Sequence, residues 1–212
     1  RILEAYVRAL RSAQRLIYLE NQFLWSPEIV AVLRSKLARP PHPDFRLVIV
    51  LPAKPNNGAD DTHGQLADLA AADEPPHRML ACTLYQAGGE QNPVYVHAKI
   101  GIVDDRWMTI GSANLNEHSL FNDTELNAVI FDQPLARQTR LRLWAEHLDL
   151  PLEEVAGDPA RVVDERWRPL ANEQRRRLDG GERLTHSLVL LPGVSHRAKR
   201  LVGPLQSFMV DG

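Results

Sequence analysis

The stretch VYVHAKIGIVDDRWMTIGSANLN, residues 94–116, combines a strand pattern with polar groups at regular positions. Polar and apolar side chains alternate over residues 97–104, which predicts a β-strand. His97 and Lys99 would then point to one face of that strand, with their backbones roughly 7 Å apart. Asp104 has the opposite parity and falls where the strand should turn, so we expect it to orient or brace neighbouring groups.

A second, apolar strand is expected at residues 107–110. A hairpin loop of two or three residues would bring Ser112 opposite Lys99 or Ala98. Asn114 follows with an amide group. Imidazole, ammonium, hydroxyl and amide groups that converge on one spot form a suitable receptacle for a phosphate.

These residues resemble the signature of the phospholipase D superfamily, which is H-x-K-x4-D followed by Gly-Ser and Asn. In this chain the signature reads His97, Lys99, Asp104, Gly111, Ser112 and Asn114. The alternative, a buried hairpin with an incidental histidine, is disfavoured because a core strand would not place a lysine beside that histidine.

The resemblance extends over about residues 16–150. The segment IYLENQFLWSPE, residues 17–28, is similar to the segment that precedes the second motif in two-motif phospholipases D, which favours the lipid enzymes over the nucleases. It makes Glu20, Asn21 and Gln22 candidates for lining the substrate cleft, because polar groups at a strand's carboxyl end face the crevice of an α/β sheet. The alternative is a strand end whose side chains cap a helix.

The resemblance implies a phosphodiester displacement in two steps, without metal or cofactor. One histidine attacks phosphorus and forms a phosphohistidine, and a second protonates the leaving alcohol and then activates water or another alcohol. Lys99 would neutralise the phosphoryl oxygens, assisted by Ser112 and Asn114. Glu125 matches the carboxylate that holds the catalytic histidine by a hydrogen bond, the alternative being a surface acid in a loose ion pair. The expected catalytic residues are therefore His97, Lys99, Asp104 and Glu125.

The chain carries one such motif, because His196 has the wrong spacing to the next lysine. Either an N-terminal half supplies the second motif, which the segment at Glu20 favours, or two copies pair about a twofold axis. In the first case His97 is the acid-base partner, and in the second both roles fall on equivalent residues. Three functions stay open: a phospholipase D-type hydrolase or transferase of phospholipids, a cardiolipin-synthase-like transferase or nuclease, and an inactive half that serves as a dimerisation or scaffold module.

Composition sets the outer limits. Hydrophobic residues make up 44% and charged residues 25%, as in globular proteins. The net charge of -2 gives no general basic field, so nucleic acid is not an expected partner.

A phospholipid substrate implies transient contact with a membrane surface. No signal peptide or apolar run long enough to cross a bilayer is visible, which favours a cytoplasmic or peripheral membrane location. Asp60, Asp61 and His63 fit no known metal-site spacing.

Strand and helix patterns alternate over residues 1–150, which predicts an α/β fold with a mixed β-sheet sandwiched between helices. Strands are also expected at 16–20, 45–52, 79–85 and 125–132, and helices at 1–14, 27–39, 65–72 and 134–148. His147 in the last helix receives no role. Residues 151–212 are expected to form a small C-terminal extension packed on the same domain, with a solvated helix face at 172–184 and an extended segment at 204–210.

Overall fold

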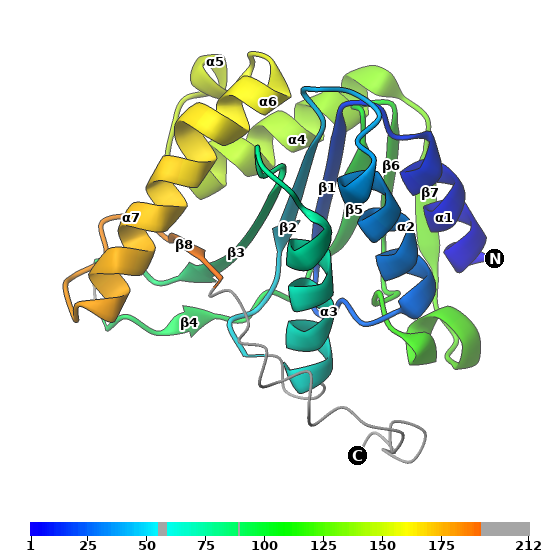
Figure 1. Ribbon diagram of the computed structural model, residues 1–212, viewed down its shortest axis with the longest axis horizontal. Coiled ribbons are helices and arrows are strands. Elements are labelled where there is room, and N and C mark those ends of the chain that lie inside the picture. Colours follow the sequence, from blue (N-terminus) through cyan, green and yellow to red (C-terminus); the bar gives the residue numbers. More distant parts are fainter. Residues whose placement is uncertain (55–58, 89, 192–212) are drawn as a thin grey trace.

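A mixed β-sheet with helices on both faces forms the body of the chain (Figure 1). The computed structural model describes residues 1–54, 59–88 and 90–191, with the backbone alone for residues 59–61. Within these residues the strand order is β4-β3-β2-β1-β5-β6-β7, and β8 also pairs with β3. The strands are β1 (Leu16–Asn21), β2 (Arg46–Val50), β3 (Met79–Tyr85), β4 (Pro93–Val94), β5 (Lys99–Val103), β6 (Trp107–Gly111), β7 (Asn127–Ile130) and β8 (Leu188–Leu190).

Two hydrophobic cores lie on the two faces of the sheet. The first packs under α1 (Ile2–Ser12), α2 (Pro27–Ala38) and α3 (Ala59–Ala72). The second packs under α4 (Gln133–Leu148), the short α5 (Leu152–Val155) and α6 (Pro159–Val162), the π-helical turn η2 (Val163–Trp167) and α7 (Arg168–Asp179). A further π-helical turn, η1 (His118–Asn122), follows β6. The predicted α/β class, with a mixed sheet between helical layers, is confirmed.

Strand β1 occupies the centre of the sheet, and all of its residues are buried. It pairs in parallel with β2 and antiparallel with β5, so it joins the two halves of the sheet. Ile17 and Leu19 belong to the first core, whereas Leu16 and Tyr18 belong to the second. Because both faces are covered, the strand reads as a nearly continuous apolar run rather than an alternating one.

The β1–β5 register decides where polar side chains gather. Asn21, the last residue of β1, lies opposite Lys99, the first residue of β5. Directly opposed residues of an antiparallel pair put their side chains on the same face. The carboxyl end of β1 therefore meets the amino end of the strand that carries the lysine of the motif.

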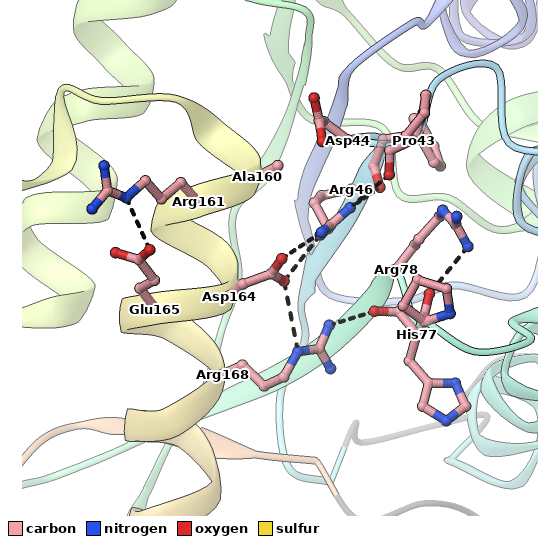
Figure 2. A network of polar contacts seen from close by, with 12 residues as sticks. Pro43, Asp44, Arg46, His77, Arg78, Ala160, Arg161, Asp164, Glu165 and Arg168 are labelled. Carbon is pink, nitrogen blue, oxygen red and sulfur yellow. Dashed lines mark hydrogen bonds and ion pairs between the residues drawn. The ribbon is translucent and has the colours of Figure 1, made fainter.

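Residues 151–191 pack against the sheet formed by the earlier part of the chain. Strand β8 pairs antiparallel with β3. Arg46 of β2 forms an ion pair with Asp164 of η2, and Arg168 donates to the carbonyl oxygen of His77 at 3.0 Å (Figure 2). The arginines of the charge run pair mainly within α7 and with the turn after it, as expected for a solvated helix face. Residues 204–210, where an extended segment is expected, lie outside the described residues.

Arg140 ties helix α4 to the turn between β5 and β6. Its guanidinium donates to both carboxylate oxygens of Asp105, at 2.7 and 2.8 Å. The same group lies 4.5 Å from the centre of the Trp144 ring. Arg140 is only 1% exposed, so these contacts rather than water stabilise its positive charge.

We expect Arg140→Ala to lower the free energy of unfolding by about 3 kcal/mol, because the change leaves the Asp105 carboxylate without its buried partner. Urea denaturation measures the loss. Arg142→Ala, an exposed arginine of the same helix, is the matched control and should change stability by less than about 0.5 kcal/mol. Equal unfolding midpoints for the two variants would contradict this account.

Candidate active site

His97 and Lys99 differ in environment. The structure begins β5 at Lys99, so the expectation that the strand starts at His97 was wrong. Residues 95–98 run from β4, which pairs with β3, to β5, which pairs with β1. They pass the ends of the strands in between and do not pair in the sheet. As a result His97 is exposed, whereas Lys99 is only 7% exposed.

The Lys99 ammonium group is held by two uncharged oxygen atoms. Its Nζ donates to Gln22 Oε1 at 3.1 Å and to the backbone oxygen of His97 at 2.9 Å. Burial lowers the pKa of Lys99, and the negative charge of Glu125 acts in the opposite direction. The structure thus brings His97, Lys99 and Gln22 together at the end of the β1–β5 ladder.

The hairpin register sets the level of Ser112 at the open end of β5 and β6. Ile100 pairs with Ile110, so continuing the register puts Ser112 level with Ala98, which is the outcome predicted for a three-residue loop. A Cβ atom on Gly111 would lie 2.2 Å from the carbonyl oxygen of Leu126. Only glycine therefore allows β6 to come this close to the chain before β7 and to present Ser112.

The hydroxyl group of Ser112 donates a hydrogen bond to Glu125 and accepts one from the backbone N–H of Leu126 at 3.1 Å. The resemblance implied that Glu125 holds His97, but in the described part of the chain the hydrogen-bonded partner of Glu125 is Ser112. Glu125 still acts on the lysine, because its charge raises the pKa of Lys99 against the effect of burial.

Asn21 binds the loop that contains the candidate residue Asn114. Its Oδ1 accepts hydrogen bonds from the backbone N–H groups of Leu115 at 3.1 Å and Phe23 at 3.2 Å. Two other amide atoms here, Asn21 Nδ2 and Asn114 Oδ1, are buried and have no hydrogen-bond partner among the described residues. Asn21 is therefore a brace between the end of β1 and the loop that contains Asn114.

Asp104 lies at the opposite end of β5 from Lys99. Its carboxylate accepts hydrogen bonds from the backbone N–H groups of Gln14, Arg15 and Leu16, at 2.7, 2.8 and 2.7 Å. The residue has a φ of 51°, in the left-handed region that Asp tolerates better than most residues. These contacts join the hairpin turn to the start of β1, which is a bracing geometry rather than contact with a reacting atom.

Glu20, expected as a possible cleft residue, does not lie with these groups. It shares a face of β1 with Leu16 and Tyr18, and that face is covered by the second core. Its carboxylate accepts from the Tyr18 hydroxyl and lies 2.8 Å from His147 Nε2. His147, which received no role from the sequence, is thus the buried partner of Glu20. The alternation of side chains along β1 could have predicted that Glu20 and Asn21 lie on opposite faces. The contact of Glu20 with His147 depends on how α4 packs and could not.

No group of three or more His, Cys, Asp or Glu residues that could hold a metal ion occurs in the described part of the chain. The side chains of Asp60 and Asp61 lie outside it. None of the helices that the structure describes is long and apolar enough to cross a membrane.

Comparison with known proteins identifies the family of the chain. The sequence model of the family described as cardiolipin synthase, PLD-like domain, matches residues 6–145. The chain therefore belongs to the phospholipase D superfamily of phosphodiesterases.

Similarity to curated phospholipases D covers much of the chain but little of those proteins. The chain is 29% identical to phospholipase D zeta 1 of Arabidopsis thaliana, over 73% of this chain and 19% of that protein. It is also 29% identical to phospholipase D A of Dictyostelium discoideum, over 69% of this chain and 16% of that protein. The chain thus spans less than one fifth of the length of either relative.

Two solved structures share the fold. NucT from Helicobacter pylori has a TM-score of 0.51 and 16% identity, over 65% of this chain and 82% of that one. Nuc from Salmonella typhimurium, a phospholipase D family member, has a TM-score of 0.51 and 21% identity, over 66% of this chain and 81% of that one. At these identities the similarity concerns the α/β architecture alone.

We expect Asp104→Asn to lower the free energy of unfolding by about 1–2 kcal/mol, because an amide cannot accept from all three backbone N–H groups. Thermal and urea unfolding measure the loss. Asp149→Asn is the matched control, since Asp149 has the same φ of 51° and is exposed. A loss as small as that of the control would show that the three hydrogen bonds do not brace the fold.

Proposed function

We propose that the chain is one catalytic half of a phospholipase D-type phosphodiesterase, which hydrolyses or transfers the phosphatidyl group of a phospholipid through a phosphohistidine intermediate. The observation that carries the proposal is the hydrogen bond from buried Lys99 to the backbone oxygen of exposed His97, together with Glu125, which accepts from Ser112 and whose charge acts on Lys99. The names of the curated relatives support a phospholipid as the substrate class.

Lys99 is suited to hold the phosphoryl group. An ammonium group has three N–H donors, and two of them are used on Gln22 and on the His97 carbonyl. The third is left for a phosphoryl oxygen. Because the group is largely shielded from water, its attraction for an anion is stronger than that of a surface lysine. Ser112 and Asn114 are the further proposed phosphate ligands.

The exposed imidazole of His97 can approach a phosphorus atom held in this way. In the proposed reaction one histidine forms a bond to phosphorus while the bond from phosphorus to the leaving alcohol breaks. The partner histidine gives its proton to that alcohol. The partner histidine then takes a proton from water or from a second alcohol. The oxygen of that molecule bonds to phosphorus and displaces the first histidine.

The reaction needs two histidines on opposite sides of phosphorus, and this chain supplies one motif. The partner is an N-terminal half of the same protein or a second copy. With an N-terminal half, His97 is the proposed acid-base residue. In a homodimer the two His97 residues share the roles. The phospholipid brings the protein to a membrane surface transiently.

A second candidate is a cardiolipin-synthase-like transferase, which passes the phosphatidyl group to the alcohol of another phospholipid. The description of the matching family names a cardiolipin synthase, which favours this candidate over a nuclease. Both candidates use the same site. Product analysis with phosphatidylglycerol vesicles separates them, because a transferase that uses a second phosphatidylglycerol as its acceptor forms cardiolipin and frees glycerol, whereas a hydrolase releases phosphatidic acid.

We expect His97→Ala to lower turnover at least about a hundredfold in the protein that carries this chain, because the nucleophile or acid-base group is lost. Release of head group from phosphatidylcholine vesicles and cleavage of bis(p-nitrophenyl) phosphate measure the loss, and circular dichroism checks the fold. His186→Ala, a histidine in the segment before β8, is the matched control. Normal turnover of His97→Ala would end the assignment. A 212-residue chain that folds but cleaves neither substrate, alone or with its partner half, would favour the scaffold function.

Because the proposed chemistry is carried by histidine, lysine and serine side chains, we expect the activity to survive prolonged treatment with EDTA. The rate is compared before and after dialysis against the chelator and again after adding zinc or magnesium. A loss of activity that either metal restores would contradict the proposed mechanism.

A further inference from the structure

The side chain of Tyr95 contacts two residues of the candidate site, His97 and Gln22. Its ring stacks on the imidazole of His97, with ring centroids 6.2 Å apart and planes inclined by 27°. Its hydroxyl oxygen accepts a hydrogen bond from Gln22 Nε2 at 2.7 Å. Gln22 in turn accepts from Lys99 at 3.1 Å, and Lys99 donates to the His97 carbonyl at 2.9 Å. These four contacts close a ring that runs through Tyr95, Gln22, Lys99 and His97.

The direction of each hydrogen bond in this ring follows from chemistry. An ammonium group can only donate, so Gln22 must turn its oxygen toward Lys99. The amide nitrogen then points to Tyr95, and an amide N–H can only donate, so the phenol oxygen must accept. The Gln22 amide is therefore locked in one orientation by a charged group at one end and a phenol at the other.

The residue that hydrogen-bonds to the stacked rings lies in a different part of the chain. Tyr95 and His97 both lie in the unpaired connection between β4 and β5, which has no ladder hydrogen bonds to fix it. Gln22 follows directly after β1, whose residues are all buried. The bond from Gln22 to the phenol thus attaches an exposed segment to the rigid centre of the sheet. An imidazole on a loop needs such an attachment if it is to meet a phosphorus atom in a fixed geometry.

We propose that Tyr95 and Gln22 are positioning residues, which hold the His97 imidazole and the Lys99 ammonium in fixed relation to each other. This inference rests on the proposed function for its kinetic consequences, but the geometry itself is testable without any activity. Tyr95 acts on His97 through the ring face and on Lys99 through Gln22. Loss of Tyr95 releases the imidazole, and loss of Gln22 releases both the ring and the lysine.

The first experiment observes the His97 ring directly. Histidine Cε1–H signals are recorded by NMR on the 212-residue chain, and the signal that disappears in His97→Ala is assigned to His97. We expect Tyr95→Leu to shift this signal downfield, because the ring current of the stacked phenol is removed. Tyr95→Phe keeps the aromatic face and should retain most of the original shift. Phe131→Leu, which removes an aromatic ring that is 78% exposed, is the control and should change nothing.

The second experiment measures kinetics in the active protein. We expect Tyr95→Leu to lower kcat about tenfold with little change in KM, because reacting groups lose their orientation while binding is retained. Gln22→Ala should lower kcat by a similar factor. Tyr95→Phe breaks the same hydrogen bond as Gln22→Ala, so adding it to Gln22→Ala should cost nothing more. Gln138→Ala, an exposed glutamine of α4, is the control for the glutamine change.

The two experiments separate this inference from the proposed function. Full activity of His97→Ala would end the proposed function and leave the NMR result to decide the geometry. An unchanged His97 signal in Tyr95→Leu would overturn the positioning role, even if His97 itself proves necessary. Additive losses from Tyr95→Phe and Gln22→Ala would also overturn it. A lower melting temperature with unmoved signals and an unchanged kcat would reduce Tyr95 to a structural contact.

Discussion

The antiparallel pairing of β1 with β5 is the constraint on which the rest of the structure depends. It sets Asn21 opposite Lys99 at one end, and Ile17 opposite Val103 at the other. Because side chains alternate along a strand, a slip by one residue would turn Lys99 into the apolar core under α4. The covered faces of both strands forbid this slip, since it would bury an unpaired charge. The position of the ammonium group is thus set by the packing of the whole sheet.

The hydrogen-bond partners that the structure gives Lys99 are uncharged. Its hydrogen bonds go to the neutral oxygens of Gln22 and the His97 backbone, while Glu125, whose charge acts on Lys99, accepts from Ser112. A carboxylate bound directly to the ammonium would compete with a phosphate for the same charge. On the other face of β1, Glu20 is kept apart from the lysine by the strand itself and is satisfied by Tyr18 and His147.

Much of this arrangement could be predicted from the sequence, because strands and helices leave periodic patterns. The strand at residues 79–85, the helix that starts after Ser26 and the hairpin after Lys99 are in the predicted places. Periodicity does not report where a ladder begins, so His97 was placed in β5 although it precedes the strand. The contacts of Glu20 with His147 and of Tyr95 with Gln22 join residues far apart in the chain. No local pattern encodes such contacts, and they emerged only with the packing.

The hairpin of β5 and β6 is fastened at both ends. At its turn, the Asp104 carboxylate accepts hydrogen bonds from the backbone N–H groups of Gln14, Arg15 and Leu16, at the start of β1. At its open end, Asn21 binds the N–H of Leu115, and the carbonyl of Leu115 accepts from Trp25 and Ser26. These contacts hold the hairpin in a fixed position relative to the central strand β1. Any change of conformation at this end of the sheet must therefore come from the linker ahead of His97, so residues 95–98 can vary in conformation while the hairpin keeps its place.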